Sequence, residues 1–195
     1  GLKRKTQLSR GVPPIYDRAS LKLSDEQKAK FASEGRKPHW RFLLRDGVTE
    51  WKDLVRGDVV FKEREMSDPV VIREDGRPLY HLCSVIDDYD TDITHIVRGE
   101  DHVSNTMCHI QMFEAISKVE GKSYQPQFAH LPLISDGEGG KLSKRLGSLS
   151  VKGVKEDEGL EAMALVSLMA RLGSSDPIEP FTSLQPLMQG FSLDK

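Results

Sequence analysis

Residues 98–102 combine side chains that can bind a charged substrate at the end of a strand. The segment reads Arg98-Gly-Glu-Asp-His102 and follows an apolar run, residues 93–97, of the length of a buried strand. In open α/β sheets, ligands bind outside the carboxyl ends of strands, where loops and helix N-termini converge. The guanidinium of Arg98 presents a fork of donors that matches a carboxylate or a phosphate. The pattern therefore predicts an anion-binding residue, with an ordinary surface ion pair as the alternative.

A second segment combines a glycine-rich loop with basic side chains. Residues 135–140 read Ser-Asp-Gly-Glu-Gly-Gly and lead into Lys141-Leu-Ser-Lys-Arg145. The ammonium groups of Lys141 and Lys144 can neutralise charge that develops on a transferring phosphoryl group, and Ser143 can donate a further hydrogen bond. Basic clusters are usually solvated faces, so this spacing alone is a weak signal of phosphate binding.

Other enzyme motifs are missing from the sequence. The GxxxxGK[ST] frame of a P-loop is absent, and neither GxGxxG after a strand nor GxSxG occurs. The six histidines form no HExxH, and His102 and His109 are too far apart on one expected helix to hold a metal between them. We therefore expect no catalytic metal and no zinc site.

Alternating short elements must position the two motifs. We expect strands over residues 69–72, 93–97 and 128–134, and helices over residues 84–90 and about 105–119. Ser104 or Asn105 is expected to cap the second helix, and Gly121 to end it. Strands and helices that alternate with short connections favour a parallel α/β sheet.

The flanking regions differ in character. Pro13 and Pro14 predict an extended segment, whereas Ser24 and Gln27 have capping-box spacing for a helix over residues 25–33. Residues 39–61 alternate in short runs typical of a small β-rich subdomain. Its aromatic residues are assigned to packing: Trp40, Phe42, Trp51 and Phe61. Residues 151–195 are predicted to be helical, with Gly173 as a stop and Thr182 as the cap of a last short helix.

Composition excludes several classes of protein. The 28 basic and 30 acidic residues nearly balance, so net charge predicts neither a nucleic-acid nor a membrane partner. Cys83 and Cys108 are too few for a disulfide framework and are expected to be buried free thiols. No apolar run reaches the length of a membrane span and no signal-peptide pattern occurs, so a cytoplasmic location is the expectation.

Four segments together resemble the glutamyl-tRNA synthetases, which are class I aminoacyl-tRNA synthetases. They are Leu8-Ser-Arg-Gly-Val-Pro-Pro-Ile-Tyr-Asp-Arg18, Tyr80-His-Leu with Asp87-Asp88, Thr94-His-Ile-Val-Arg-Gly-Glu-Asp-His102 and Lys141-Leu-Ser-Lys-Arg145. They occur in the order and at the spacing of that family, and the last resembles its form of the KMSKS signature. All four in order are strongly specific.

The resemblance covers essentially the whole chain and implies an α/β fold in three parts. Residues 1–68 match the tail of the first Rossmann half and the small α+β domain that binds the acceptor end of tRNA. Residues 69–134 match the second half of the parallel Rossmann sheet. Residues 135–195 match the KMSKS loop and a helical region that contacts the tRNA stem.

The resemblance also implies an activity, the ATP-dependent attachment of glutamate to the 3′ end of tRNA(Glu) through glutamyl-adenylate. The residues that match glutamate contacts are Tyr80, Ser84, Arg98 and His102. The residues that match ATP contacts are Lys141, Ser143, Lys144, Leu133 and Ile134. Of these, Lys144 matches the lysine that stabilises the transition state in which pyrophosphate forms. Implied partners are glutamate, tRNA(Glu) and ATP with Mg²⁺, and we expect a monomer without a membrane partner.

The chain departs from the family in lacking the HIGH motif and an anticodon-binding domain. At Ser84 some relatives carry Asn, and at His102 others carry Trp. We therefore expect that these residues alone do not form glutamyl-adenylate at a useful rate. A glutamyl-queuosine tRNA synthetase paralogue, a glutaminyl-tRNA synthetase and a non-catalytic tRNA acceptor-binding module are the alternatives.

Overall fold

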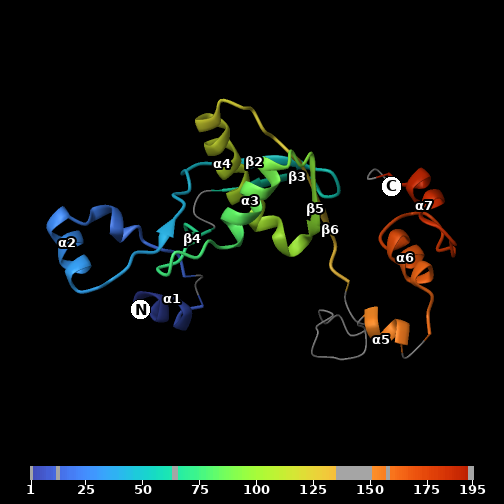
Figure 1. The fold of residues 1–195 in the computed structure, drawn as a ribbon, viewed down its shortest axis with the longest axis horizontal. Coiled ribbons are helices and arrows are strands. Elements are labelled where there is room, and N and C mark those ends of the chain that lie inside the picture. Colours follow the sequence, from blue (N-terminus) through green and yellow to red (C-terminus); the bar gives the residue numbers. More distant parts are fainter. Residues whose placement is uncertain (1, 12–13, 63–65, 135–150, 157–158, 193–195) are drawn as a thin grey trace. The chain divides into compact units, whose positions relative to one another are not determined.

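The computed structural model describes residues 2–11, 14–62, 66–134, 151–156 and 159–192, and Figure 1 labels their elements. The chain forms two compact units. The first comprises residues 1–97 with 102–129, and the second comprises residues 98–101 with 130–195. The predicted site residues are therefore divided between two units.

The N-terminal part of the first unit has two helices joined by a segment in which Pro13, one of the two prolines of the predicted extended stretch, lies outside the described residues. Helix α1 (Leu2–Ser9), which no prediction covered, precedes it, and a 3-10 turn follows at Ala19–Lys22. Helix α2 (Asp25–Ser33) has the predicted capping box. The hydroxyl of Ser24 accepts from the Gln27 N–H at 3.2 Å, and the Gln27 side chain accepts from the Ser24 N–H at 3.0 Å. This reciprocal pair satisfies two backbone donors at the start of the helix.

The strands form two sheets. Strands β2 (Thr49–Asp53) and β3 (Gly57–Phe61) make an antiparallel hairpin, close to the strands expected in the β-rich region. The larger sheet has the order β3-β2-β6-β5, with β6 (Gln127–Leu131) parallel to β2 and β5 (His95–Gly99) at the edge. Strand β1 (Trp40–Arg41) pairs antiparallel with β4 (Val70–Ile72) in a separate sheet.

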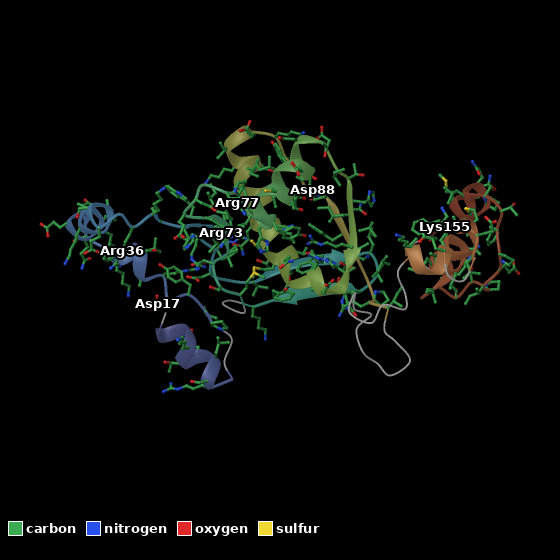
Figure 2. All side chains as sticks on the ribbon, turned by 60° about the horizontal axis from the view of Figure 1, so that its bottom comes forward. Asp17, Arg36, Arg73, Arg77, Asp88 and Lys155 are labelled. Atoms are coloured by element: carbon green, nitrogen blue, oxygen red, sulfur yellow. The ribbon has the colours of Figure 1, made fainter. Side chains whose placement is uncertain are left out.

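The expectation that residues 69–72 join β5 and β6 in one parallel sheet is wrong. The backbone of β4 is occupied on one side by β1. On its other side the chain returns, because Ile72 bridges to Pro78 and the Leu79 N–H donates to the Val71 carbonyl at 2.9 Å. Strand β4 therefore has no edge left for β5. Arg73 and Arg77 lie close together beside the intervening turn (Figure 2).

Helices α3 (Tyr80–Asp90) and α4 (Val103–Glu120) pack on each other, and α4 also packs on β2 (Figure 1). Both begin earlier than expected. The 3-10 turn Glu100–His102 runs directly into α4, so His102 takes the cap position and the prediction of Ser104 or Asn105 is wrong. Gly121 ends α4 with φ 69°, as predicted. Buried residues on these helices join the core of the unit: Val85, Tyr89, Met107, Cys108, Met112 and Phe113.

Packing of the aromatic and thiol side chains follows the predictions with two exceptions. Trp51 stacks on Phe61 with ring centroids 5.8 Å apart, and with Phe42 these rings pack against the core. Trp40, however, is 63% exposed, because both residues of the short strand β1 face solvent. Cys83 is also exposed, whereas Cys108 is buried as expected. The buried face of α3 carries Val85 and Tyr89. Cys83 lies two positions before Val85 on this helix and therefore points away from the buried face.

The predicted domain boundary at residues 68 and 69 falls in a tightly held segment. The Asp68 carboxylate is 5% exposed and accepts from Nε and Nη2 of Arg18 at 2.9 and 3.0 Å. It also accepts from the Leu44 N–H at 3.0 Å. Arg18 can be located in Figure 2 from its labelled neighbour Asp17. The backbone of Arg18 is left-handed, with φ 56°. Three distant segments of the first unit thus meet at one carboxylate, and the division of the chain at residue 68 stays a prediction.

The second unit contains α5 (Val151–Glu156), α6 (Ala162–Arg171) and α7 (Leu184–Gly190), of which α6 and α7 pack together (Figure 1). The Ser167 hydroxyl donates to the Met163 carbonyl at 2.6 Å and accepts from the Phe181 N–H at 3.0 Å. Gly173 follows α6 with φ 81°, as predicted, but Ser183 rather than Thr182 takes the cap position of α7. Ser183 has the extended backbone of a cap residue (φ −150°, ψ 165°), so the helix starts one residue later than predicted.

Among the helices of both units that the structure describes, the longest is α4, which has 18 residues and mixes polar with apolar side chains. Within the ranges that the structure describes, none of the helices combines the length and the apolar character that a membrane span needs.

Candidate functional site

The predicted site residues fall into three groups. Those in the first unit are Tyr80, Ser84 and His102. Those in the second unit are Arg98, Leu133 and Ile134. Lys141, Ser143 and Lys144 lie outside the described residues.

Tyr80 and His102 come together although they are 22 residues apart. Tyr80 is the first residue of α3, and its Oη lies 3.1 Å from Nδ1 of His102, at the cap of α4. The side-chain amide of Asn105 also donates to this nitrogen, at 3.0 Å. Because Nδ1 of His102 accepts in this arrangement, the ring carries its proton on Nε2. Asn105 is a polar neighbour that the sequence analysis did not assign to the site.

Ser84 extends this group along α3. Positions four residues apart on a helix lie on the same face, so Ser84 follows Tyr80 by one turn. Tyr80 is 46% exposed and Ser84 is half-buried. The first unit therefore offers two hydroxyl groups and an imidazole to a polar ligand.

Two histidines that the sequence analysis did not assign lie beside Tyr80. His109 is fully buried, and its Nε2 lies 3.1 Å from Nδ1 of His81. The ring centroid of Tyr80 is 5.5 Å from that of His81 and 5.6 Å from that of His109. The sequence shows only that His109 follows His102 by two helical turns; the contact of His109 with His81 depends on the packing of α3 on α4.

Arg98 lies near the end of β5, as predicted, and is held by a second buried imidazole. Its Nε donates to Nε2 of His130 on β6 at 3.3 Å, and His130 is fully buried. Because Nε2 of His130 accepts, this ring is neutral with its proton on Nδ1. The contact fixes one edge of the guanidinium, and a guanidinium suits planar, bidentate binding of a carboxylate.

Leu133 and Ile134 follow β6 and are 37% and 41% exposed. The backbone N–H of Leu133 donates to the carboxylate of Glu100 at 3.3 Å. A Cβ on Gly99 would lie 3.2 Å from the Leu133 side chain and 2.7 Å from an Asp101 oxygen. Glycine at position 99 therefore lets the end of β5 approach the segment after β6.

Two further features of the described residues bear on ligand binding: groups of metal-ligating side chains and cavities. No group of three or more His, Cys, Asp and Glu side chains in that part is arranged to hold a metal ion. A cavity of about 270 Å³ lies in the first unit between α1 and Asp68. Its lining includes none of the predicted site residues.

Comparison with known proteins identifies the family. Residues 2–194 match the family model described as tRNA synthetases class I (E and Q), catalytic domain. Because the match spans nearly the whole chain, the chain belongs to this family of class I aminoacyl-tRNA synthetases. The mixed α/β fold, with strands β2 and β6 in parallel, agrees with this class.

Particular relatives narrow the likeness within the family. The chain is 56% identical over 194 residues to a glutamate–tRNA ligase of Azospirillum brasilense and 50% identical over 193 residues to glutamate–tRNA ligase 1 of Maricaulis maris. It covers 42% of the length of each of these relatives. A crystal structure of a glutamate tRNA ligase from Elizabethkingia meningosepticum in complex with its amino acid has a TM-score of 0.80 at 28% identity. That match covers 98% of this chain and 42% of the other, so the chain corresponds to a part of such a ligase.

Proposed function

We propose that the protein to which these residues belong is a glutamate–tRNA ligase, which attaches glutamate to the 3′ end of tRNA. The relatives named glutamate–tRNA ligase support the proposal across the full length of the chain. The structural observation that supports it is Arg98 near the end of β5, whose Nε donates to the buried His130 and whose guanidinium is of the kind that binds a carboxylate.

In the first step, glutamate binds and is activated by ATP. Arg98 pairs with a carboxylate of glutamate, and Tyr80, Ser84 and His102 make its polar contacts. A guanidinium discriminates a carboxylate from an amide because the amide supplies only one acceptor and adds opposed donors. An oxygen of the glutamate α-carboxylate then attacks the α-phosphorus of ATP, the bond to the β-phosphate breaks, and pyrophosphate leaves.

The nucleotide is assigned to the segment after β6 and to the basic residues that follow it in the chain. Backbone of Leu133 and Ile134 meets adenine, for which the Leu133 N–H would exchange its contact with Glu100. Lys144 and Lys141 stabilise the negative charge that grows on the leaving pyrophosphate, with Ser143 as a further donor. ATP enters as its magnesium complex.

In the second step, a hydroxyl of the terminal ribose of tRNA attacks the activated carbonyl carbon, and AMP leaves. Residues 1–68 are assigned to the acceptor end of the tRNA. Arg36 has an exposed guanidinium within these residues, and Arg73 and Arg77 have exposed guanidiniums just beyond them in the first unit, so all three can contact phosphates (Figure 2). The reversal Arg77→Glu is expected to weaken tRNA binding and to reduce its dependence on salt concentration.

The proposal is tested by ATP–pyrophosphate exchange with protein expressed from the complete reading frame that encodes this chain. Exchange is expected to require glutamate and tRNA. Arg98→Ala and Lys144→Ala should each lower it at least about tenfold, equivalent to about 1.4 kcal/mol. A matched control is His95→Ala, an exposed position on β5, which should leave the rate within about twofold.

Exchange that is absent, or that is indifferent to both residues, would refute the assignment. Retained tRNA binding would then favour the non-catalytic acceptor-binding module. A tRNA that lacks its terminal adenosine distinguishes the ligase from the glutamyl-queuosine paralogue. A ligase that acts on the 3′ end cannot charge this tRNA. Residues 1–195 expressed alone are expected to give no useful exchange.

The remaining properties belong to the same proposal. We assign a monomer that acts in the cytoplasm and needs no zinc in these residues. Light scattering after size-exclusion chromatography gives the mass in solution, and metal analysis of the purified protein gives the zinc content. A stoichiometric zinc ion bound to residues 1–195 would contradict the assignment.

A further inference from the structure

A continuous series of ring contacts connects the core of the first unit to Tyr80. Centroid distances are 5.3 Å from Tyr89 to Tyr124, 5.0 Å from Tyr124 to Phe113 and 6.4 Å from Phe113 to His109. The series then reaches Tyr80, 5.6 Å beyond His109. Phe113 is 2% exposed, whereas Tyr80 is 46% exposed. His109 therefore links a rigid core to a half-exposed ring.

His81 and His109 add a polar link with a defined direction. The two rings meet edge to face, with centroids 5.3 Å apart and an interplanar angle of 88°. One of the two nitrogens, Nδ1 of His81 and Nε2 of His109, donates while the other accepts. The hydrogen bond fixes the orientation of both imidazoles and satisfies a polar atom of a ring that is fully buried.

Tyr80 has reason to need such support. It lies in the first turn of α3, and Leu79 at the cap of that helix makes no side-chain capping bond. A half-exposed tyrosine in an uncapped first turn has alternative rotamers within reach. Ring contacts from His81 and His109 restrict those rotamers and keep the Tyr80 hydroxyl on Nδ1 of His102.

We infer that His81 and His109 are positioning residues of the amino acid subsite, which act on glutamate through Tyr80. The inference rests on the proposed function, because it takes Tyr80 and His102 as contacts of glutamate. A preorganised contact strengthens binding by removing the cost of ordering it. The two histidines thus lower the Michaelis constant for glutamate without touching glutamate or ATP.

The test uses ATP–pyrophosphate exchange by the same full-length protein, with Michaelis constants measured separately for glutamate and ATP. His81→Phe and His109→Phe each keep an aromatic ring but remove the hydrogen bond between the pair. Each is expected to raise the constant for glutamate about tenfold and to leave that for ATP within about twofold. His81→Asn, which keeps a polar atom near the position of Nδ1, should recover most of the loss.

The double variant gives a sharper readout. If both residues act through one shared hydrogen bond, the double Phe variant loses no more than either single variant. His95→Phe is the matched control, since it makes the same change at an exposed histidine of β5 and should alter neither constant. Thermal unfolding of each variant identifies any that is not folded.

Three outcomes would overturn the inference. An active parent whose Phe variants are folded and keep the glutamate constant would refute it and leave the proposed function intact. Equal rises for glutamate and ATP would show general destabilisation instead of positioning. A parent without glutamate-dependent exchange would remove the proposed function and this inference together.

Discussion

The buried imidazole of His130 accepts a hydrogen bond from Nε of Arg98 at 3.3 Å, which joins strand β6 to the end of β5. A cationic imidazole could not accept this bond, so the contact requires a neutral ring. The guanidinium is thereby directed by a side chain that is itself fixed in the sheet.

Replacement of this acceptor is expected to weaken glutamate binding. His130→Leu removes a hydrogen bond that orients the guanidinium of Arg98, so the Michaelis constant for glutamate should rise about tenfold. His130→Gln keeps an acceptor oxygen and should lose less. Leu131→Ala, at an exposed neighbour on β6, serves as the control in the same exchange assay. A glutamate constant unchanged in folded His130→Leu would disprove this role.

The clamp at Asp68 is expected to contribute strongly to stability. Arg18→Ala leaves a nearly buried carboxylate without its bidentate partner, which should lower the free energy of unfolding by about 3 kcal/mol. Arg36→Ala removes an exposed pair with Glu34 and should cost less than about 1 kcal/mol. Urea unfolding followed by circular dichroism measures both, and equal costs would contradict the importance of the clamp.

Stability is expected to fall at alkaline pH partly through Tyr124. Burial, with smaller effects of Asp88 and Asp92, raises the pKa of Tyr124 from 10.0 to about 12. Its phenol must keep its proton to donate to the carbonyls of Asp88 and Ile93, at 2.9 and 2.7 Å. The contribution is complete below pH 10 and is lost as pH rises to about 12, because the unfolded state releases its proton first.

Tyr124→Phe should therefore lower stability at neutral pH by about 1–2 kcal/mol. It should also flatten the decline between pH 10 and pH 12. Denaturant titrations at a series of pH values measure both effects. A variant with an unchanged alkaline slope would show that the Tyr124 phenol does not control this transition.

The two thiols are expected to differ in reactivity. Cys83 is exposed on α3, whereas burial and, to a smaller degree, Asp68 raise the pKa of Cys108 from 9.0 to about 12. Because the thiolate is the reactive form, Ellman's reagent at pH 8 should label one thiol quickly and the second only after unfolding. Cys83→Ser should abolish the fast reaction, and rapid labelling of that variant would contradict the burial of Cys108.

Much of the fold follows from local rules in the sequence. Ser24 and Gln27 predict a helix start because both halves of a capping box depend on neighbouring residues only. Gly121 ends α4 for the same kind of reason, since a left-handed residue closes a helix locally. The position of Arg98 near the end of β5 is likewise visible as an apolar run that stops at charged residues.

The errors arise where long-range pairing decides. Strand β4 pairs with β1, which lies about 30 residues earlier in the chain. No local sequence pattern predicts that pairing. Trp40 suits a core by its type but lies on the exposed strand of that small sheet. His81 and His109 meet only because α3 packs on α4, so neither residue alone indicates their contact.

The Arg18–Asp68 clamp also has a consequence for the order in which the first unit folds. The bond closes a loop between residues 50 positions apart, and loop closure costs conformational entropy before any contact rewards it. Asp68 must first be placed by Leu44 and by the pairing of β1 with β4. We therefore expect the N-terminal segment to join late, after the folding transition state. Loss of Arg18 should accelerate unfolding while refolding keeps nearly its original rate.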